Sequence, residues 1–167
     1  MKRYLKYIPD LMAVFMAVIF LDSLRFKFTD HPNTQEIFGR LDGWAGTLGA
    51  AGLFGHTGLF SQYVIGAIEL LAATLLLVGL HPRFKHLQAG GALAGLLVMT
   101  GAVSFHLFTP LGIDPNSDGA GLFVAACTNL TFAALLLGLF RRTALVELLR
   151  RLARTLQPFD GPAPDRV

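Results

Sequence analysis

The chain is poor in charged residues and in cysteine, and each shortage excludes a class of protein. Charged side chains make up 15% of its 167 residues, whereas a soluble domain carries about 25%. Cys127 is the single cysteine, which excludes an intramolecular disulfide and CxxC redox chemistry. No two histidines have HxxxH spacing, so the sequence predicts no metal site. A haem held by histidines from separate segments remains an alternative.

Four long apolar stretches account for the low charge, and hydrophobic residues reach 53% of the chain. They comprise residues 8–24, 60–80, 87–108 and 121–140. At about 1.5 Å of helical rise per residue, each is long enough to cross a hydrocarbon core of about 30 Å. The sequence therefore predicts an all-α protein, a four-transmembrane-helix bundle in one domain, residues 1–140. No small-x-small cleavage site follows the first stretch, so we interpret it as an uncleaved span.

Lysine and arginine are distributed unevenly between the two ends of these stretches. Eleven of the 14 lie before the first stretch, between the second and third, or after the fourth. By the positive-inside rule, both termini are cytoplasmic, and the loops 25–59 and 109–120 face outward. The basic residues flank apolar stretches, so we expect a lipid bilayer as the partner of this +3 chain, and no nucleic acid.

The first outward loop has an unusual composition. Residues 30–33 form a predicted turn, after which Asn33 or Thr34 is expected to cap a short helix that ends at Leu41. The glycine-rich run 45–58 is too short to span a bilayer, and we expect it to cover the mouth of the bundle.

The segment after the fourth stretch alternates apolar and basic residues at helical spacing. This pattern predicts an amphipathic cytoplasmic helix over residues 141–157 that lies at the membrane interface. Docking onto a soluble partner is the alternative. The tail, residues 158–167, is predicted to be disordered.

Asp22, Glu69 and His106 are the most informative of the polar residues that interrupt the apolar stretches. Glu69 lies near the middle of the second stretch, where an isolated carboxylate costs a few kcal/mol. It must therefore be protonated, paired with a cation, or beside a wet cavity. Asp22 precedes Arg25 by three positions, which places both on one helical face with Lys27 just beyond.

These residues converge on the outward half of the predicted bundle. We therefore predict a polar pocket with Glu69 at its floor, Arg25 or Lys27 reaching down to it, and His106 in its wall. Asp22 is a further candidate for ligand or proton binding. The alternative is a structural network of ion pairs that ties the first three spans together.

Three segments, FLDSLRFKFTDHPNTQEIF, GAIELLAATLLLVGL and MTGAVSFHLFTPLGI, are similar in order and spacing to the DoxX family of small bacterial membrane proteins. The resemblance covers about residues 10–140. It implies a four-helix protein of the bacterial inner membrane, in which Lys27, Glu69 and His106 match polar positions of the family. DoxX-like proteins include membrane subunits of thiosulfate:quinone oxidoreductase or quinol oxidase, and partners in redox-stress complexes.

Taken together, the resemblance and the polar residues favour a subunit of a membrane redox complex that binds a quinone or another lipophilic substrate beside a redox partner. Glu69 and His106 would exchange protons or hydrogen bonds with the quinone oxygens, and Arg25 or Lys27 would stabilise an anionic form. One alternative is a non-catalytic scaffold that recruits a partner. Another is a small transporter subunit, which would need a homo-oligomer because the four spans contain no inverted repeat.

Overall fold

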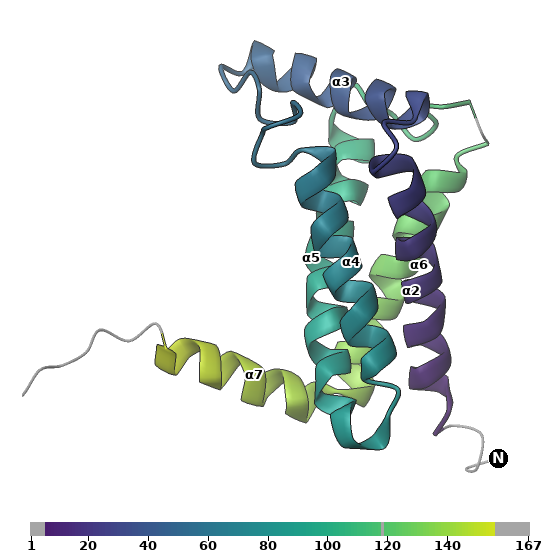
Figure 1. Cartoon of the computed structure of the whole chain (residues 1–167), viewed down its shortest axis with the longest axis vertical. Helices are drawn as coiled ribbons and strands as arrows, with labels where there is room; N and C mark the ends of the chain where they lie inside the picture. Colours follow the sequence, from purple (N-terminus) through teal and green to yellow (C-terminus); the bar gives the residue numbers. More distant parts are fainter. Residues whose placement is uncertain (1–5, 118, 156–167) are drawn as a thin grey trace, which may run out of the picture.

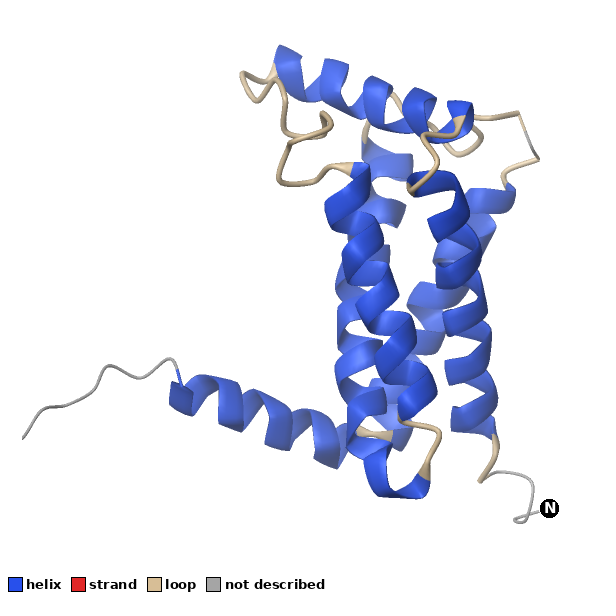
Figure 2. Ribbon diagram, in the orientation of Figure 1, coloured by secondary structure: helices blue, strands red, loops and turns tan. Residues whose placement is uncertain are grey.

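The computed structural model describes residues 6–117 and 119–155, which form helices and no strand (Figure 2). Four long helices lie side by side as a bundle, and two further helices cross its two ends (Figure 1). The bundle helices are α2 (Ile8–Lys27), α4 (Gln62–Val78), α5 (Lys85–Phe108) and α6 (Gly121–Leu135), the last continued by the π-helical segment η2 (Leu136–Phe140). The all-α prediction is confirmed for the described residues.

Within residues 6–117 and 119–155, two helical segments are long and apolar enough to cross a membrane. These are Pro82–Phe108, which joins the 3-10 turn η1 (Pro82–Phe84) to α5, and Gly121–Phe140. α4 is apolar but has 17 residues, and α2 has charged residues near both of its ends. Each predicted stretch forms a helix whose ends lie close to the predicted ones, while the crossing of a bilayer by all four stays a prediction.

Small residues bring the helices close together in one half of the bundle, the half that contains η2. A Cβ on Gly91 would lie 2.8 Å from the Ala72 carbonyl oxygen, and one on Gly95 would lie 3.1 Å from the Phe20 ring. Gly91 and Gly95 are one turn apart, so they lie on one face of α5 and let the neighbouring helices approach. Alanines that are fully buried fill the same half: Ala13, Ala17, Ala72, Ala73, Ala89, Ala92 and Ala133.

α3 (Pro32–Thr47) lies across the opposite end, where α2 finishes and α4 begins (Figure 1). We call this the α3 end of the bundle. The predicted cap was wrong, because His31 is the N-cap and its ring accepts a hydrogen bond from the Asn33 amide at 3.3 Å. The predicted end at Leu41 was also wrong. The helix continues through two glycines, Gly43 and Gly46, to Thr47 because Leu41 and Ala45 are buried on its inner face.

α7 (Arg142–Thr155) leaves the other end of the bundle and extends sideways across its long axis (Figure 1). We call this the α7 end. The helix predicted for residues 141–157 is thus confirmed over the described part. The predicted disordered tail, residues 158–167, lies outside the described residues.

Candidate functional site

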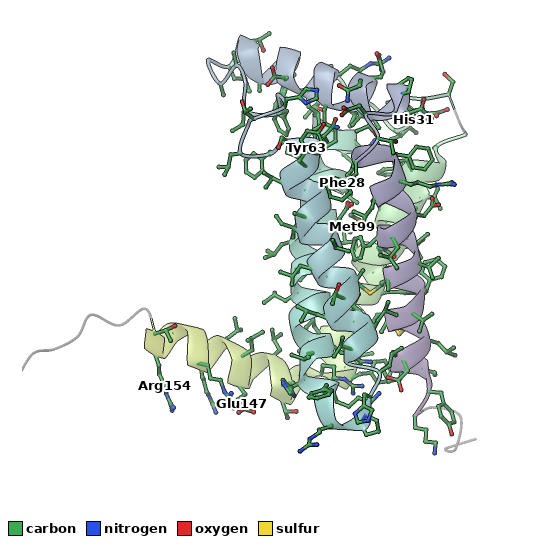
Figure 3. All side chains as sticks on the ribbon, viewed as in Figure 1. Phe28, His31, Tyr63, Met99, Glu147 and Arg154 are labelled. Atoms are coloured by element: carbon green, nitrogen blue, oxygen red, sulfur yellow. The ribbon has the colours of Figure 1, made fainter. Side chains whose placement is uncertain are left out.

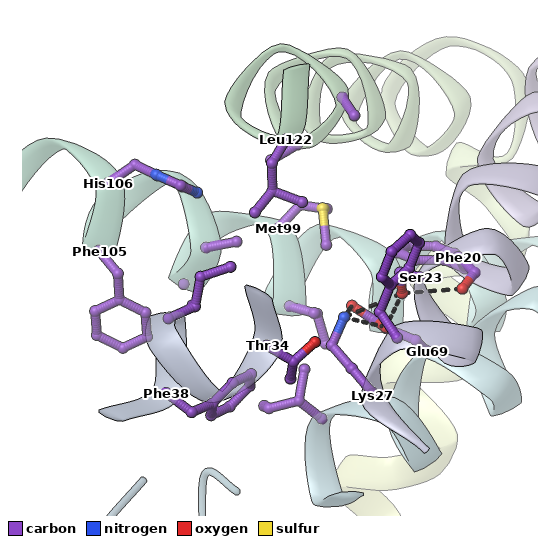
Figure 4. Close-up of a pocket in the computed structure, with 18 of the residues that line it drawn as sticks. Phe20, Ser23, Lys27, Thr34, Phe38, Glu69, Met99, Phe105, His106 and Leu122 are labelled. Carbon is purple, nitrogen blue, oxygen red and sulfur yellow. Dashed lines mark hydrogen bonds and ion pairs between the residues drawn. The ribbon is translucent and has the colours of Figure 1, made fainter. Parts of the chain in front are cut away.

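A cavity of about 730 Å³ lies at the α3 end, between the bundle helices and beneath α3. Its volume is within the range of about 300–1,000 Å³ that small-molecule sites occupy. Most of its lining is apolar, and Figure 4 shows Met99 and Leu122 among the side chains that line it. The polar side chains in the lining include Ser23, Lys27, Thr34, Glu69 and His106.

Glu69 and Lys27 form a buried ion pair at one side of this cavity. The Lys27 Nζ atom lies 2.9 Å from Glu69 Oε2 and 3.2 Å from Oε1. The Glu69 side chain is only 3% exposed and that of Lys27 is 14% exposed. A buried carboxylate needs such a partner because desolvation of an unpaired charge costs several kcal/mol. Of the three possibilities that the sequence left open for Glu69, the structure shows pairing with a cation.

Ser23 completes the cluster around this carboxylate. Its hydroxyl oxygen lies 2.5 Å from Glu69 Oε2 and 3.0 Å from the Phe20 carbonyl oxygen, either of which can accept its one hydrogen, and it accepts from Lys27 Nζ at 3.0 Å. Ser23 and Lys27 are four residues apart on α2, so they lie on one face of this helix. Our sequence reasoning missed Ser23, although this spacing to Lys27 was a signal that could have found it.

A glycine on α4 lies beside this cluster. Gly66 lies three residues before Glu69, on the same face of α4. A Cβ at Gly66 would lie 3.5 Å from Lys27 Cδ and 3.2 Å from the Phe28 ring. The absence of a side chain therefore makes room chiefly for the Phe28 ring, while the aliphatic stem of Lys27 would remain in ordinary contact with a Cβ at this position.

His106 lies across the cavity from Glu69, on α5 (Figure 4). It is 5% exposed, and its Nδ1 atom lies 2.6 Å from the Gly112 carbonyl oxygen. A carbonyl can only accept, so Nδ1 carries the hydrogen, and Nε2 of the neutral ring is an acceptor. The Nε2 atom has no hydrogen-bond partner within residues 6–117 and 119–155. His106 thus lies in the wall of the cavity, as predicted, with its Nε2 atom free of protein partners among the described residues.

Thr34 supplies a second vacant polar group, this time from α3. The residue is 5% exposed, and its hydroxyl points into the cavity in Figure 4. In the described part of the chain no residue forms a hydrogen bond with this hydroxyl. The sequence indicated Thr34 only as a possible helix cap, so its place in the cavity was missed.

Asp22 and Arg25 do not join the buried cluster. Arg25 Nε lies 3.0 Å from Asp22 Oδ1, and the two side chains are 69% and 56% exposed. The guanidinium of Arg25 also lies 4.8 Å from the centre of the Phe26 ring. The structure thus brings Lys27 to Glu69 and leaves Arg25 outside, whereas the sequence had left both open. Asp22 reaches only the rim of the cavity.

A second polar cluster fastens α3 over the cavity. The Oδ1 atom of Asp30 accepts from the Tyr63 hydroxyl at 2.6 Å and from Gln62 Nε2 at 2.5 Å. Gln62 Nε2 also donates to the Lys27 carbonyl at 2.8 Å, and Gln35 on α3 donates to Gln62 Oε1 at 2.9 Å. The hydrogen bonds that Asp30 accepts from Tyr63 and Gln62 lower its pKa, with that from Tyr63 the largest cause. We call this cluster the Asp30 latch.

Asn129 is a buried polar residue outside the cavity lining. It is fully buried on α6, and neither its amide nitrogen nor its oxygen has a hydrogen-bond partner among the described residues. It does not bond to Glu69.

No protein-family model matches this chain, and neither the curated proteins nor the solved structures include a detectable relative. The function must therefore be argued from the cavity itself.

Proposed function

We propose that the protein spans the bacterial inner membrane four times and binds a neutral, lipophilic ligand of the quinone type in the cavity beneath α3. In this proposal it is a subunit of a membrane redox complex, and the electrons pass to a partner subunit. The DoxX resemblance is the reason for naming a quinone and a redox partner. Independently of that resemblance, the polar groups of the cavity favour an uncharged ligand that forms hydrogen bonds.

The observation that carries the proposal is that the cavity has two kinds of polar group, one pair of opposite charges and two groups without a partner among the described residues. The charges of Lys27 and Glu69 neutralise each other at 2.9 Å, so this side favours an uncharged ligand. Thr34 and His106 instead have a vacant hydroxyl and a vacant imidazole nitrogen directed into an apolar space. Both groups face the open space of the cavity, where they are available to form hydrogen bonds with a ligand.

A quinone matches these groups chemically. A carbonyl oxygen of the quinone is an acceptor for the Thr34 hydroxyl. In the reduced form, a quinol hydroxyl donates to the vacant Nε2 of His106, which is placed to take its proton on oxidation. The Glu69 carboxylate is the second candidate proton acceptor, because its pairing with Lys27 keeps a base beside the ligand.

The exposed apolar surface supports the membrane location. Large side chains that point away from the bundle include Leu11 and Val18 on α2, Leu71 on α4, and Leu97 on α5. Their exposed fractions lie between 55% and 66%, so α2 and α4 have apolar outer faces like that of α5. Contiguous apolar surface of this kind is unusual on a soluble monomer. Lipid around all four helices is the simplest cover for it.

Trp44 is a built-in reporter for the test. It is the single tryptophan, and its ring centroid lies 6.4 Å from that of Phe105, which lines the cavity. Titration of decylubiquinone into the full-length protein in detergent should give saturable quenching of Trp44 emission. His106→Phe keeps an aromatic ring beside Phe123 but removes both nitrogens, and it should weaken the quenching.

Thr100→Val is the matched control for this titration. The Thr100 hydroxyl donates to the Leu96 carbonyl of its own helix at 2.7 Å, and the residue is exposed outside the cavity. This variant should bind as the unmodified protein does. Quenching that never saturates, or that is identical in His106→Phe, would show that decylubiquinone only partitions into the detergent and would overturn the proposal.

A further inference from the structure

The α7 end of the bundle has positive charge that no acidic side chain compensates. Within the described ranges, Arg83, Arg142, Arg150 and Arg154 have no acidic partner. The α3 end differs, because each of its basic residues is paired with an acid. The three pairs there are Arg25 with Asp22, Lys27 with Glu69, and Arg40 with Glu36.

The polar and apolar side chains of α7 lie on opposite sides of the helix. Leu145 packs against the core of the bundle, while Val146 and Leu149 further along are 37% and 48% exposed. Figure 3 shows Glu147 and Arg154 directed away from the bundle. The polar side thus points away from the bundle, and the apolar side lies opposite.

A polar cluster holds the start of α7 in place. Lys85 Nζ lies 2.5 Å from Asp10 Oδ1, and Gln88 donates to the same oxygen at 2.9 Å. Arg141, the residue just before α7, donates to Gln88 Oε1 through Nη2 at 2.6 Å and through Nε at 2.9 Å. Since these residues come from α2, α5 and the chain before α7, the sideways course of α7 is set by the bundle.

We infer that α7 and the turn before α5 form a binding surface for the anionic phospholipid headgroups of the leaflet at this end. The inference rests on the proposed four-span placement, which puts the apolar side of α7 against the acyl chains and its arginines at the phosphates. Guanidinium groups suit this role because they bind phosphate oxygens through two parallel hydrogen bonds. A soluble acidic partner would match the arginines but would leave the apolar side exposed.

Lipid selectivity tests this inference on the full-length protein in detergent. The protein is incubated with equal amounts of dioleoyl phosphatidylglycerol and dioleoyl phosphatidylcholine, and the retained lipids are counted by native mass spectrometry. We expect enrichment of phosphatidylglycerol. Arg150→Gln with Arg154→Gln should reduce that enrichment by about fivefold for each arginine. Arg151 is avoided because its loss would leave Glu147 unpaired.

Arg25→Gln with Arg40→Gln is the matched control, because it removes the same charge from the α3 end. This control should retain the full enrichment. Equal retention of the two lipids by the unmodified protein, or full enrichment in the Arg150 and Arg154 variant, would overturn the inference in favour of a soluble partner. The decylubiquinone titration needs no phosphatidylglycerol, so a failure of the proposed quinone site is recognised separately.

Discussion

Lys27 Nζ lies 2.9 Å from Glu69 Oε2, although the two residues are 42 positions apart in the chain. This contact joins the last turn of α2 to the middle of α4 beside the cavity. It explains how a carboxylate is tolerated in an apolar stretch, and it means that α2 and α4 cannot separate at this end without exposing an unpaired charge.

The ion pair should show strong coupling in a double-mutant cycle. Lys27→Met leaves the Glu69 carboxylate buried without its cation, and loss of one partner of a buried pair costs about 3–5 kcal/mol. The double variant Lys27→Met with Glu69→Leu should be much less destabilised than the sum of the single variants. Thermal unfolding in detergent measures the stability of each single variant and of the double variant. Additive effects would mean that the two groups do not interact in solution.

Thr34→Val should weaken ligand binding without loss of the fold. The substitution keeps the shape of the side chain but removes the vacant hydroxyl, which is worth about 0.5–1.5 kcal/mol, or about 2- to 12-fold in affinity. Trp44 quenching by decylubiquinone measures the change, and the unfolding temperature shows whether α3 stays in place. Unchanged affinity would remove Thr34 from the binding site.

The Asp30 latch should make the position of α3 sensitive to acid. The pKa of Asp30 is lowered from 3.8, chiefly by the Tyr63 hydroxyl. A lowered pKa in the folded state means that the charged form is stabilised by folding. Its contribution is therefore present above pH 3.8 and is lost as the pH falls through the lowered value. Trp44 emission should report this loss, because Trp44 lies on α3.

Asp30→Asn is the variant that tests the latch. It removes the titrating group, so its Trp44 emission should lack the acid transition that the unmodified protein shows. Asp22→Asn, which changes the exposed pair with Arg25, should keep that transition. An acid transition of the same size in Asp30→Asn would assign it to another group.

Asn129→Leu should raise the stability of the bundle. The Asn129 side chain is fully buried with both polar atoms unpaired among the described residues, and such a group costs about 1–3 kcal/mol. Leucine has a similar size and no polar atom, so the unfolding temperature should rise. A clear fall would show that the amide has a partner, such as a bound water or an adjacent subunit.

The positions of the bundle helices were predictable from the sequence. Long apolar runs bounded by proline, glycine and charged residues leave few alternatives to helices, because the backbone polar groups must be satisfied within each segment. It was predictable for the same reason that Glu69 must be protonated, paired with a cation or beside a wet cavity, since a lone carboxylate is costly in an apolar environment. Neither conclusion required knowledge of how the helices pack.

The cavity and its contacts were decided only by the tertiary structure. Arg25 and Lys27 were equivalent in the sequence, but two positions on a helix are about 200° apart, and only the packing of α2 on α4 determines which of them faces Glu69. Thr34 became a cavity residue because α3 begins at Pro32 and buries one face against the bundle. Local patterns set the helices, whereas the direction of each face depends on which neighbour it packs against.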